Sequence, residues 1–255
     1  MNSKTPLIIA GMHRSGTSLI ARFVHHSGVD LGNHLVGPKE SNPYGHFEDV
    51  EILDFHRRIL VREFGDSMWV PGPPHIAEED RKTAAKLIAA RRHKRYWGWK
   101  EPRTSLFLDL WNGLLPDAHF LFVVRHPLLV LDSLSRRTKS KFYHFWKHGK
   151  FLRSWMIYNR ECAHFYRQHT DRCMLVMLRD VAEAPNAFIK SLSDWLSMEF
   201  DPGKFQALYE PRALSLRRDR LLFSSRRLRS ESAALHDELR READTTSIAS
   251  APPRV

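Results

Sequence analysis

The stretch LIIAGMHRSGTSLIARFV, residues 7–24, decides the fold of this chain. Four apolar residues lead into a loop between Gly11 and Gly16, and a segment of helical pattern starts at Thr17. In a strand–loop–helix unit of this kind, backbone N–H groups can surround an anion, and the helix dipole favours its negative charge. The spacing is that of a Walker A loop, except that Thr17 occupies the usual lysine position and Arg14 lies inside the loop.

The rest of the chain continues the alternation of short apolar runs and longer helical segments. The predicted strands are Leu7–Ala10, Tyr96–Lys100, His119–Arg125 and Met174–Leu178. The predicted helices are Thr17–His26, Val50–Phe64, Ala77–Arg95, Ser105–Leu114, Leu128–Arg137, Lys150–His169 and Ala187–Met198. This order predicts a single α/β domain, residues 1–239, whose central parallel sheet carries helices on both faces. Residues 240–255 are rich in Thr, Ser, Ala, Pro and charge, and we expect a disordered tail there.

The composition favours anionic ligands without choosing among them. Lys and Arg number 40 against 29 Asp and Glu, a net charge of +11, which suits polyanions, acidic partners or membrane surfaces. No apolar run approaches the ~18 residues of a membrane span, and no signal peptide is evident. Cys162 and Cys173 form no CxxC pattern, which favours two reduced thiols and a cytoplasmic location.

Two anion-binding segments can be read from the residues themselves. In the first loop, the backbone of Ser15–Ser18 and the fork of Arg14 can hold a phosphate, although a plain glycine turn is the alternative. Arg125 ends a strand at the sheet edge where open α/β folds bind ligands, and Ser133 lies about two helical turns further on. These two side chains are expected to converge on one anion, unless Arg125 only caps the sheet and Ser133 lies on the surface.

Taken in order, these segments resemble the sulfotransferase family. The likeness extends to Asn42–Glu48, Trp99–Arg103 and Trp155–Asn159. It implies a three-layer fold similar to P-loop nucleotide kinases and the donor 3'-phosphoadenosine 5'-phosphosulfate. The resemblance assigns the 5'-phosphosulfate to the first loop and the 3'-phosphate to Arg125 and Ser133. The loop residues concerned are His13, Arg14, Ser15, Gly16, Thr17 and Ser18.

The chain departs from the family at Leu178, where many members carry a tyrosine that touches the adenine, so the adenine contact is not predicted. The Arg-rich run from Arg217 to Arg229 either helps to hold the 3'-phosphate or forms a solvated helix face. The long loops Gly32–Phe47 and Gly65–His75 are expected to be binding loops, with a solvated connection as the alternative for the second.

The resemblance also implies catalytic roles. Glu48 is the predicted general base for the acceptor hydroxyl, with His46 as the rival and a helix N-terminal charge as the structural alternative. Arg14 and Lys100 would stabilise charge on the leaving phosphate and the sulfuryl oxygens, although Lys100 also fits an ordinary strand end. No metal is expected, because a sulfuryl group carries less charge than a triphosphate. His144 and His148 share a helical spacing without a suitable third ligand.

The sequence therefore predicts an enzyme that moves a sulfuryl group by in-line displacement to a hydroxyl or amine. The acceptor stays open between small molecules, carbohydrates and peptides, as does the oligomeric state. The aromatic residues between Phe142 and Trp146 fit an acceptor groove or a surface helix. Two rival functions remain: a P-loop phosphotransferase that uses ATP or GTP, and a non-enzymatic protein that binds nucleic acid through its Arg-rich C-terminal third. No recognised nucleic-acid-binding motif supports the last.

Overall fold

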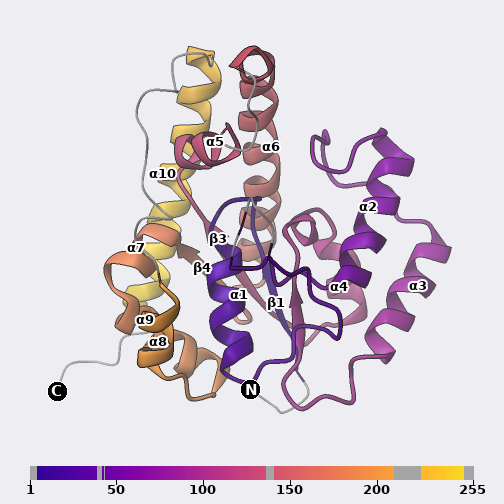
Figure 1. Ribbon diagram of the computed structural model, residues 1–255, viewed down its shortest axis with the longest axis vertical. Helices are drawn as coiled ribbons and strands as arrows, with labels where there is room; N and C mark the ends of the chain where they lie inside the picture. The colour runs from indigo at the N-terminus through magenta and orange to yellow at the C-terminus, as the bar shows by residue number, and fades with distance from the viewer. Residues whose placement is uncertain (1–4, 39–41, 43, 136–140, 210–224, 250–255) are drawn as a thin grey trace.

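Four parallel strands form the centre of the computed structural model, which describes residues 5–38, 42, 44–135, 141–209 and 225–249 (Figure 1). The side chains of residues 141–147 and 244–249 fall outside this description. The strands are β1 (Leu7–Ala10), β2 (Gly98–Lys100), β3 (His119–Val124) and β4 (Cys173–Met177), in the order β2-β1-β3-β4. All four predicted strands are confirmed, each with slightly shifted ends at most.

The register brings the predicted functional residues to one edge of the sheet. Ile9 of β1 pairs with Lys100 at the end of β2, and Ala10 pairs with Phe122 of β3. Because parallel strands share a carboxyl edge, Gly11, Lys100 and Arg125 leave the sheet side by side. The edge combines the glycine loop with the residues that follow two neighbouring strands.

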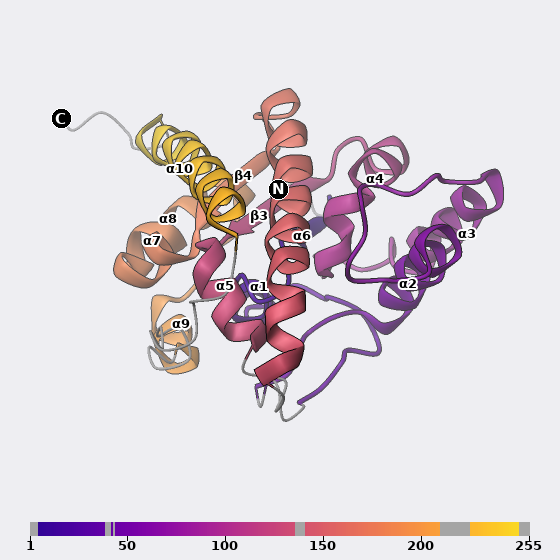
Figure 2. The same cartoon turned by 90° about the horizontal axis from the view of Figure 1, so that it is seen from above.

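Alternation along β1 separates two hydrophobic layers. Leu7 and Ile9 pack with α1 (Thr17–His26), α7 (Leu178–Glu183), α8 (Pro185–Leu196) and α9 (Pro202–Leu208). Ile8 and Ala10 pack with the opposite layer. That layer holds α2 (Val50–Phe64), α3 (Glu78–Ala89), the short 3-10 helix η1 (Pro102–Leu106), α4 (Leu108–Leu114), α5 (Pro127–Ser135), α6 (Lys141–Gln168) and α10 (Arg226–Ala249). Figure 2 shows α2 and α3 to one side and α7 and α8 to the other.

The helices agree with the sequence where the pattern is local. The bounds of α1 and α2 are those predicted. The predicted helix from Ser105 is instead η1 followed by α4, and α6 begins at Lys141, ahead of its predicted start. Helices α7, α9 and α10 were not expected. Helix α10 extends through Ala249, into the segment for which disorder was expected, because its Leu235 and Leu239 are buried in the core.

Glycine is required at two positions of the first loop. Gly11 has φ 138°, and a Cβ there would lie 2.4 Å from the carbonyl oxygen of Val123. Gly16 has φ 91°, and a Cβ there would lie 2.4 Å from the side chain of Leu178. Any larger residue would push the loop away from the ends of β3 and β4, so the two glycines hold it against the sheet.

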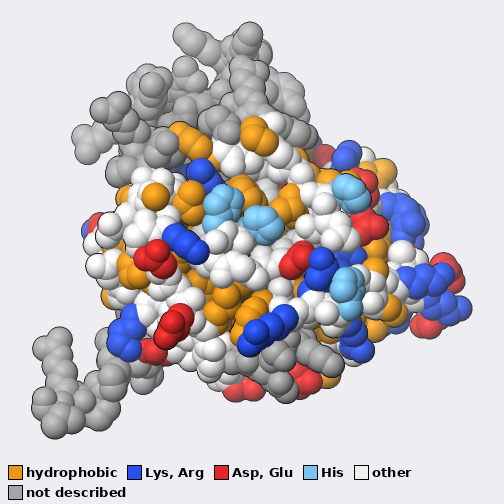
Figure 3. All heavy atoms as spheres, turned by 60° about the horizontal axis from the view of Figure 1, so that its bottom comes forward, with side chains coloured by type: hydrophobic (Ala, Val, Ile, Leu, Met, Phe, Trp, Pro, Cys, Tyr) orange, Lys and Arg blue, Asp and Glu red, His pale blue; other side chains and the backbone are white. Residues whose placement is uncertain are grey.

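Three further observations bear on the sequence predictions. Cys162 and Cys173 are both buried and free. Within the described part of the chain, no helix combines the length and apolarity that crossing a bilayer requires. On the face shown in Figure 3, basic and acidic side chains are interspersed rather than gathered into areas of one sign.

Candidate active site

A cavity of about 390 Å³ opens at the carboxyl edge of the sheet. It is bounded by the first loop, the start of α1, the loop before α2, the inner face of α2 and the residues after β2. Of the predicted site residues, those that line it are His13, Arg14, Gly16, Thr17, Ser18, Glu48, Lys100 and Arg125. Both predicted binding loops contribute, through Tyr44 and His46 from one and Ser67 and Met68 from the other.

The two predicted anion-binding segments are joined directly. The Nε of Arg14 donates to the hydroxyl of Ser133 over 2.8 Å, and Nη1 of Arg125 donates to the carbonyl of Arg14 over 3.0 Å. The indole of Trp155 donates to the carbonyl of Arg125 over 3.0 Å, which fixes the end of β3 against α6. Arg14 itself has a left-handed backbone, φ 69°. The loop, the strand end and α5 therefore form one connected unit.

Other residues of the first loop are buried beside this unit or begin helix α1. Ser15 is fully buried, donates its N–H to the carbonyl of Met12, and has no partner for its hydroxyl among the described residues. Ser133 is also buried and lies behind Arg14 rather than on the cavity wall. Thr17 and Ser18 begin α1, so their N–H groups have no acceptor within the helix and remain suited to an anion.

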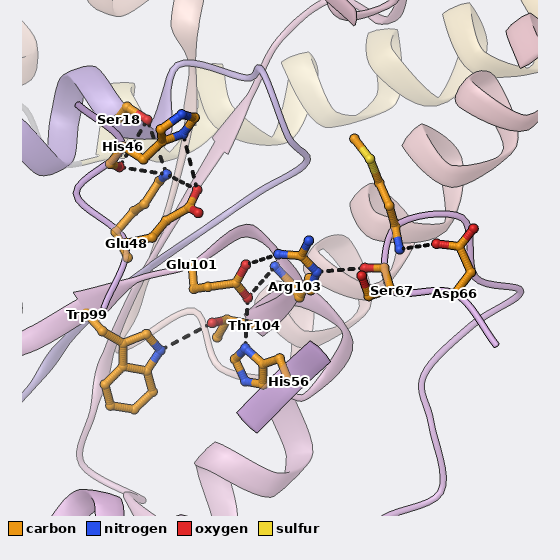
Figure 4. Close-up of polar contacts among 12 residues, drawn as sticks. Ser18, His46, Glu48, His56, Asp66, Ser67, Trp99, Glu101, Arg103 and Thr104 are labelled. Carbon is orange, nitrogen blue, oxygen red and sulfur yellow. Dashed lines mark hydrogen bonds and ion pairs between the residues drawn. The ribbon is translucent and has the colours of Figure 1, made fainter. Parts of the chain in front are cut away.

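A nearly buried ion pair between Lys100 and Glu48 lines the cavity, and Figure 4 shows Glu48 close to Ser18 and His46. Lys100 Nζ lies 2.8 Å from Oε1 of Glu48, 3.0 Å from the carbonyl of His46 and 3.2 Å from the hydroxyl of Ser18. An ammonium has three N–H donors, so each one has an acceptor. The ring of His46 also reaches the carboxylate, at 3.9 Å. The structure thus brings Glu48, Lys100 and His46 together.

The helix-capping role falls to the neighbour of Glu48. Asp49 is the N-cap of α2, where its carboxylate accepts from the N–H groups of Glu51 and Ile52. Arg91 donates to the same carboxylate over 2.6 Å. Since Asp49 satisfies the helix terminus, the side chain of Glu48 is available to the cavity. The role at the helix N-terminus, which was the structural alternative for Glu48, is therefore taken by Asp49.

Next to Lys100 in the sequence, Glu101 forms a second ion pair in which its carboxylate is fully buried. Glu101 accepts from the guanidinium and backbone N–H of Arg103 and from Nδ1 of His56, while Nε2 of His56 accepts from Trp111. Burial alone would raise the pKa of Glu101, but Arg103 and His56 outweigh it and hold the pKa at about 2. Burial lowers the pKa of His56. The network comprises a carboxylate, a guanidinium and a neutral imidazole.

The cavity also contains cationic residues to which sequence reasoning assigned no role. They are Arg22 of α1, Arg57 of α2 and Arg103 of η1. The position of Arg103 directly after a strand end was a signal that could have been used, because the residues that follow parallel strands meet at the ligand edge. Arg57 gave no such signal, because a charged residue in an amphipathic helix is ordinarily solvated.

A second cavity, of about 430 Å³, lies beside the first, and Arg125 lines both. Its wall contains Leu129, Met177 and Leu178 together with His236 and Arg240 of α10. Leu178, where the resemblance leads one to expect a tyrosine, packs against Gly16 of the loop. Leu178 therefore lies beside the loop and presents an apolar side chain, without a hydroxyl, to the second cavity.

The structure describes only part of the Arg-rich run, of the two spaced histidines and of the aromatic segment 142–146. Residues 217 and 218 lie outside the described part of the chain, and Arg227 is exposed and paired with Glu231 on the surface of α10. The side chains of His144 and of the aromatic residues 142–146 also lie outside the description. His148 is buried beside the hydroxyl of Ser135. Among the described side chains, no group of three or more His, Cys, Asp and Glu could hold a metal ion.

Comparison with known proteins agrees with this architecture. The model of the sulfotransferase family matches residues 6–202. The sulfotransferase domain from the curacin biosynthetic pathway superposes with a TM-score of 0.59 at 14% identity, covering 94% of this chain and 99% of that one. The corresponding domain of the Synechococcus PCC 7002 olefin synthase gives 0.53 at 18% identity, with 99% and 98% coverage.

A sulfotransferase from Alicyclobacillus acidocaldarius gives a TM-score of 0.51 at 14% identity, with 94% of each chain covered. No curated protein sequence matches significantly. At these identities the solved structures show a common fold, whereas the family model matches most of the sequence. The chain belongs to the sulfotransferase family.

Proposed function

We propose that this sulfotransferase takes its sulfuryl group from 3'-phosphoadenosine 5'-phosphosulfate and transfers it to a hydroxyl or amine by in-line displacement. The observation that carries the proposal is the connected unit of Arg14, Arg125 and Ser133, whose two arginines line one cavity with the Glu48–Lys100 pair. A donor with phosphate groups at both ends of its ribose requires two cationic positions, and a transfer reaction requires a base near the first of them.

The donor would lie along the carboxyl edge of the sheet. Its phosphosulfate would accept from the N–H groups of the loop and the start of α1, with Arg14 beside it. Its 3'-phosphate would lie at Arg125, between the two cavities. The second cavity, with apolar walls at Leu129 and Leu178, offers space for the nucleoside.

The reaction would proceed without a change of charge on the arginines. The acceptor oxygen or nitrogen attacks sulfur and forms the new bond as the S–O bond to the 5'-phosphate breaks. The acceptor proton passes to the carboxylate of Glu48, and adenosine 3',5'-bisphosphate leaves. Lys100 lies between the base and the hydroxyl of Ser18, so its ammonium can follow the charge that develops on the sulfuryl and bridging oxygens.

Ligand-dependent melting tests the donor assignment. Adenosine 3',5'-bisphosphate at about 100 times its Kd should raise the Tm by roughly 5 °C, from about 2.7 kcal/mol of linked stabilisation. ATP with Mg²⁺ serves as the comparison, and Arg14→Ala should remove most of the shift. A shift with ATP and Mg²⁺ alone would favour the phosphotransferase. A shift with mixed-sequence DNA but neither nucleotide would favour the nucleic-acid-binding protein.

A further inference from the structure

The first cavity has more cationic than anionic side chains, even when each ion pair is counted as neutral. Lys100 is neutralised by Glu48, and Arg103 by Glu101. Arg14 and Arg125 belong to the connected unit that faces the donor. Arg22 lies over the ring of Tyr44. This leaves Arg57, which lines the cavity, is solvent-exposed and has no ion-pair partner among the described residues.

Arg57 lies about two turns into α2, the helix that follows Glu48. It belongs to the face of α2 that also carries Leu53, one turn earlier, and both line the cavity. The next residue toward the N-terminus, His56, is bonded to Glu101, which places this part of α2 beside η1. Arg103, which donates to the carbonyl of Ser67, completes that end of the cavity.

Helix geometry gives the axial offset of Arg57 from the start of α2, which follows Glu48 closely. Glu48 precedes the start of α2 at Val50, and a rise of 1.5 Å per residue puts Arg57 about 10 Å further along the axis. Between the two, the wall is formed by Leu53 and Met68, which are half-buried. In chain order, the cavity wall therefore carries the carboxylate of Glu48, the apolar side chain of Leu53 and the guanidinium of Arg57.

Within the part of the chain that the structure describes, no carboxylate forms an ion pair with that cation. Glu101 is buried and shared between His56 and Arg103. Asp66 does not line the cavity, and its carboxylate accepts from the N–H groups of Met68 and Trp69 in its own loop. An exposed guanidinium that faces a cavity without a fixed partner is suited to a carboxylate or sulfonate of a ligand, which it can bind through two parallel N–H donors.

We propose that Arg57 is the specificity residue for an acidic acceptor: a molecule with a hydroxyl or amine, an apolar middle part and a carboxylate or sulfonate about 10 Å away. This inference rests on the proposed function, since it places the acceptor nucleophile at Glu48. The proposal names the substrate class of the same cavity. It adds a second point of attachment, which would hold the acceptor in line with the donor.

A matched set of probes tests the charge requirement. 4-(4-Hydroxyphenyl)butanoic acid, its primary amide and the sulfonate of the same length differ only in the distal group. With the donor supplied, the wild type should use the two acids with kcat/KM roughly 10-fold or more above that for the amide, as expected for a bond to a charged group. Arg57→Gln should lower kcat/KM for the two acids to the value for the amide. Arg57→Lys should restore part of the preference for the acids.

Arg58→Gln is the matched control, because Arg58 is the next residue of the same helix, lies over the ring of Phe55 and does not line the cavity. It should keep the full preference for the acids. Equal use of acid and amide by the wild type would overturn the inference. So would an equal loss on acid and amide in Arg57→Gln, because Arg57 would then act on something other than the distal charge.

Calorimetric titration of the two acids into wild type and Arg57→Gln gives the same comparison without any donor. Failure of the proposed donor would appear as absent melting shifts and absent transfer, while this titration still reports on Arg57. Weaker binding of both acids to Arg57→Gln than to wild type supports the inference. Equal binding to the two proteins, or none to either, overturns it.

Discussion

Lys100, the last residue of β2, and Glu101, which follows it, form ion pairs that differ in construction. The Lys100–Glu48 pair lies in the cavity, with 11% of the Glu48 side chain exposed, and its other lysine contacts are a hydroxyl and a carbonyl. In the Glu101–Arg103 pair the carboxylate is fully buried and also accepts from the backbone N–H of Arg103 and from His56, while the side chain of Arg103 is 10% exposed and lines the cavity. A ligand could replace contacts of the Glu48 carboxylate, whereas the Glu101 carboxylate is out of its reach. The first is suited to chemistry and the second to holding the cavity wall.

The largest effect expected from this difference is on stability. Glu101→Gln should lower the free energy of unfolding by about 3–5 kcal/mol, because it leaves the buried guanidinium of Arg103 without its carboxylate. Urea denaturation measures it. As the matched control, Glu183→Gln breaks an exposed pair with Arg179 and should leave the urea midpoint almost unchanged. Similar losses in both variants would contradict the comparison.

The same network sets an expected pH dependence. The pKa of Glu101 lies at about 2, below the ordinary value of 4.5. Its contribution is therefore complete above pH 4.5 and lost as the pH falls toward 2. The pKa of His56 is lowered from 6.5 by burial, so stability also begins to fall below pH 6.5. The Glu101→Gln profile should lack the steeper fall below pH 4.5, and an unchanged profile would remove Glu101 as its source.

The next effect is on catalysis. Glu48→Gln should reduce sulfuryl transfer about 100-fold, the scale for a general base. Its loss of unfolding free energy should stay well below that of Glu101→Gln, because an amide oxygen can still accept from Lys100 at the cavity surface. Transfer of labelled sulfate to a phenol probe gives the rate, and the urea experiment gives the stability. Full activity in this variant would remove Glu48 from the mechanism.

The smallest effect separates the two candidate bases. His46 contributes its carbonyl to Lys100, and its ring lies 3.9 Å from Glu48. His46→Gln keeps the carbonyl and should reduce transfer less than about tenfold, since the proton acceptor remains. A loss as large as that of Glu48→Gln would give the base role to His46 or to both groups together.

Sequence reasoning succeeded where function follows strand ends and failed where it depends on tertiary partners. The glycine loop, Arg125 and Lys100 could be placed because parallel strands share one edge. The end of α3 could not be predicted, because the sequence pattern favours one helix over Ala77–Arg95. Only the structure shows that the helix ends at Ala89 and that Arg91 donates to Asp49. Helix α10 was missed because its arginines suggested a solvated segment, whereas Leu235 and Leu239 have a partner surface only once α6 and β4 are in place.

The bond between the guanidinium of Arg125 and the carbonyl of Arg14 has unequal consequences for replacing the two residues. The acceptor is a backbone carbonyl, so replacing the side chain of Arg14 leaves this bond in place, whereas replacing Arg125 removes it. Arg125→Ala should therefore loosen the first loop in addition to removing its own charge, while Arg14→Ala should leave Arg125 bound to the loop.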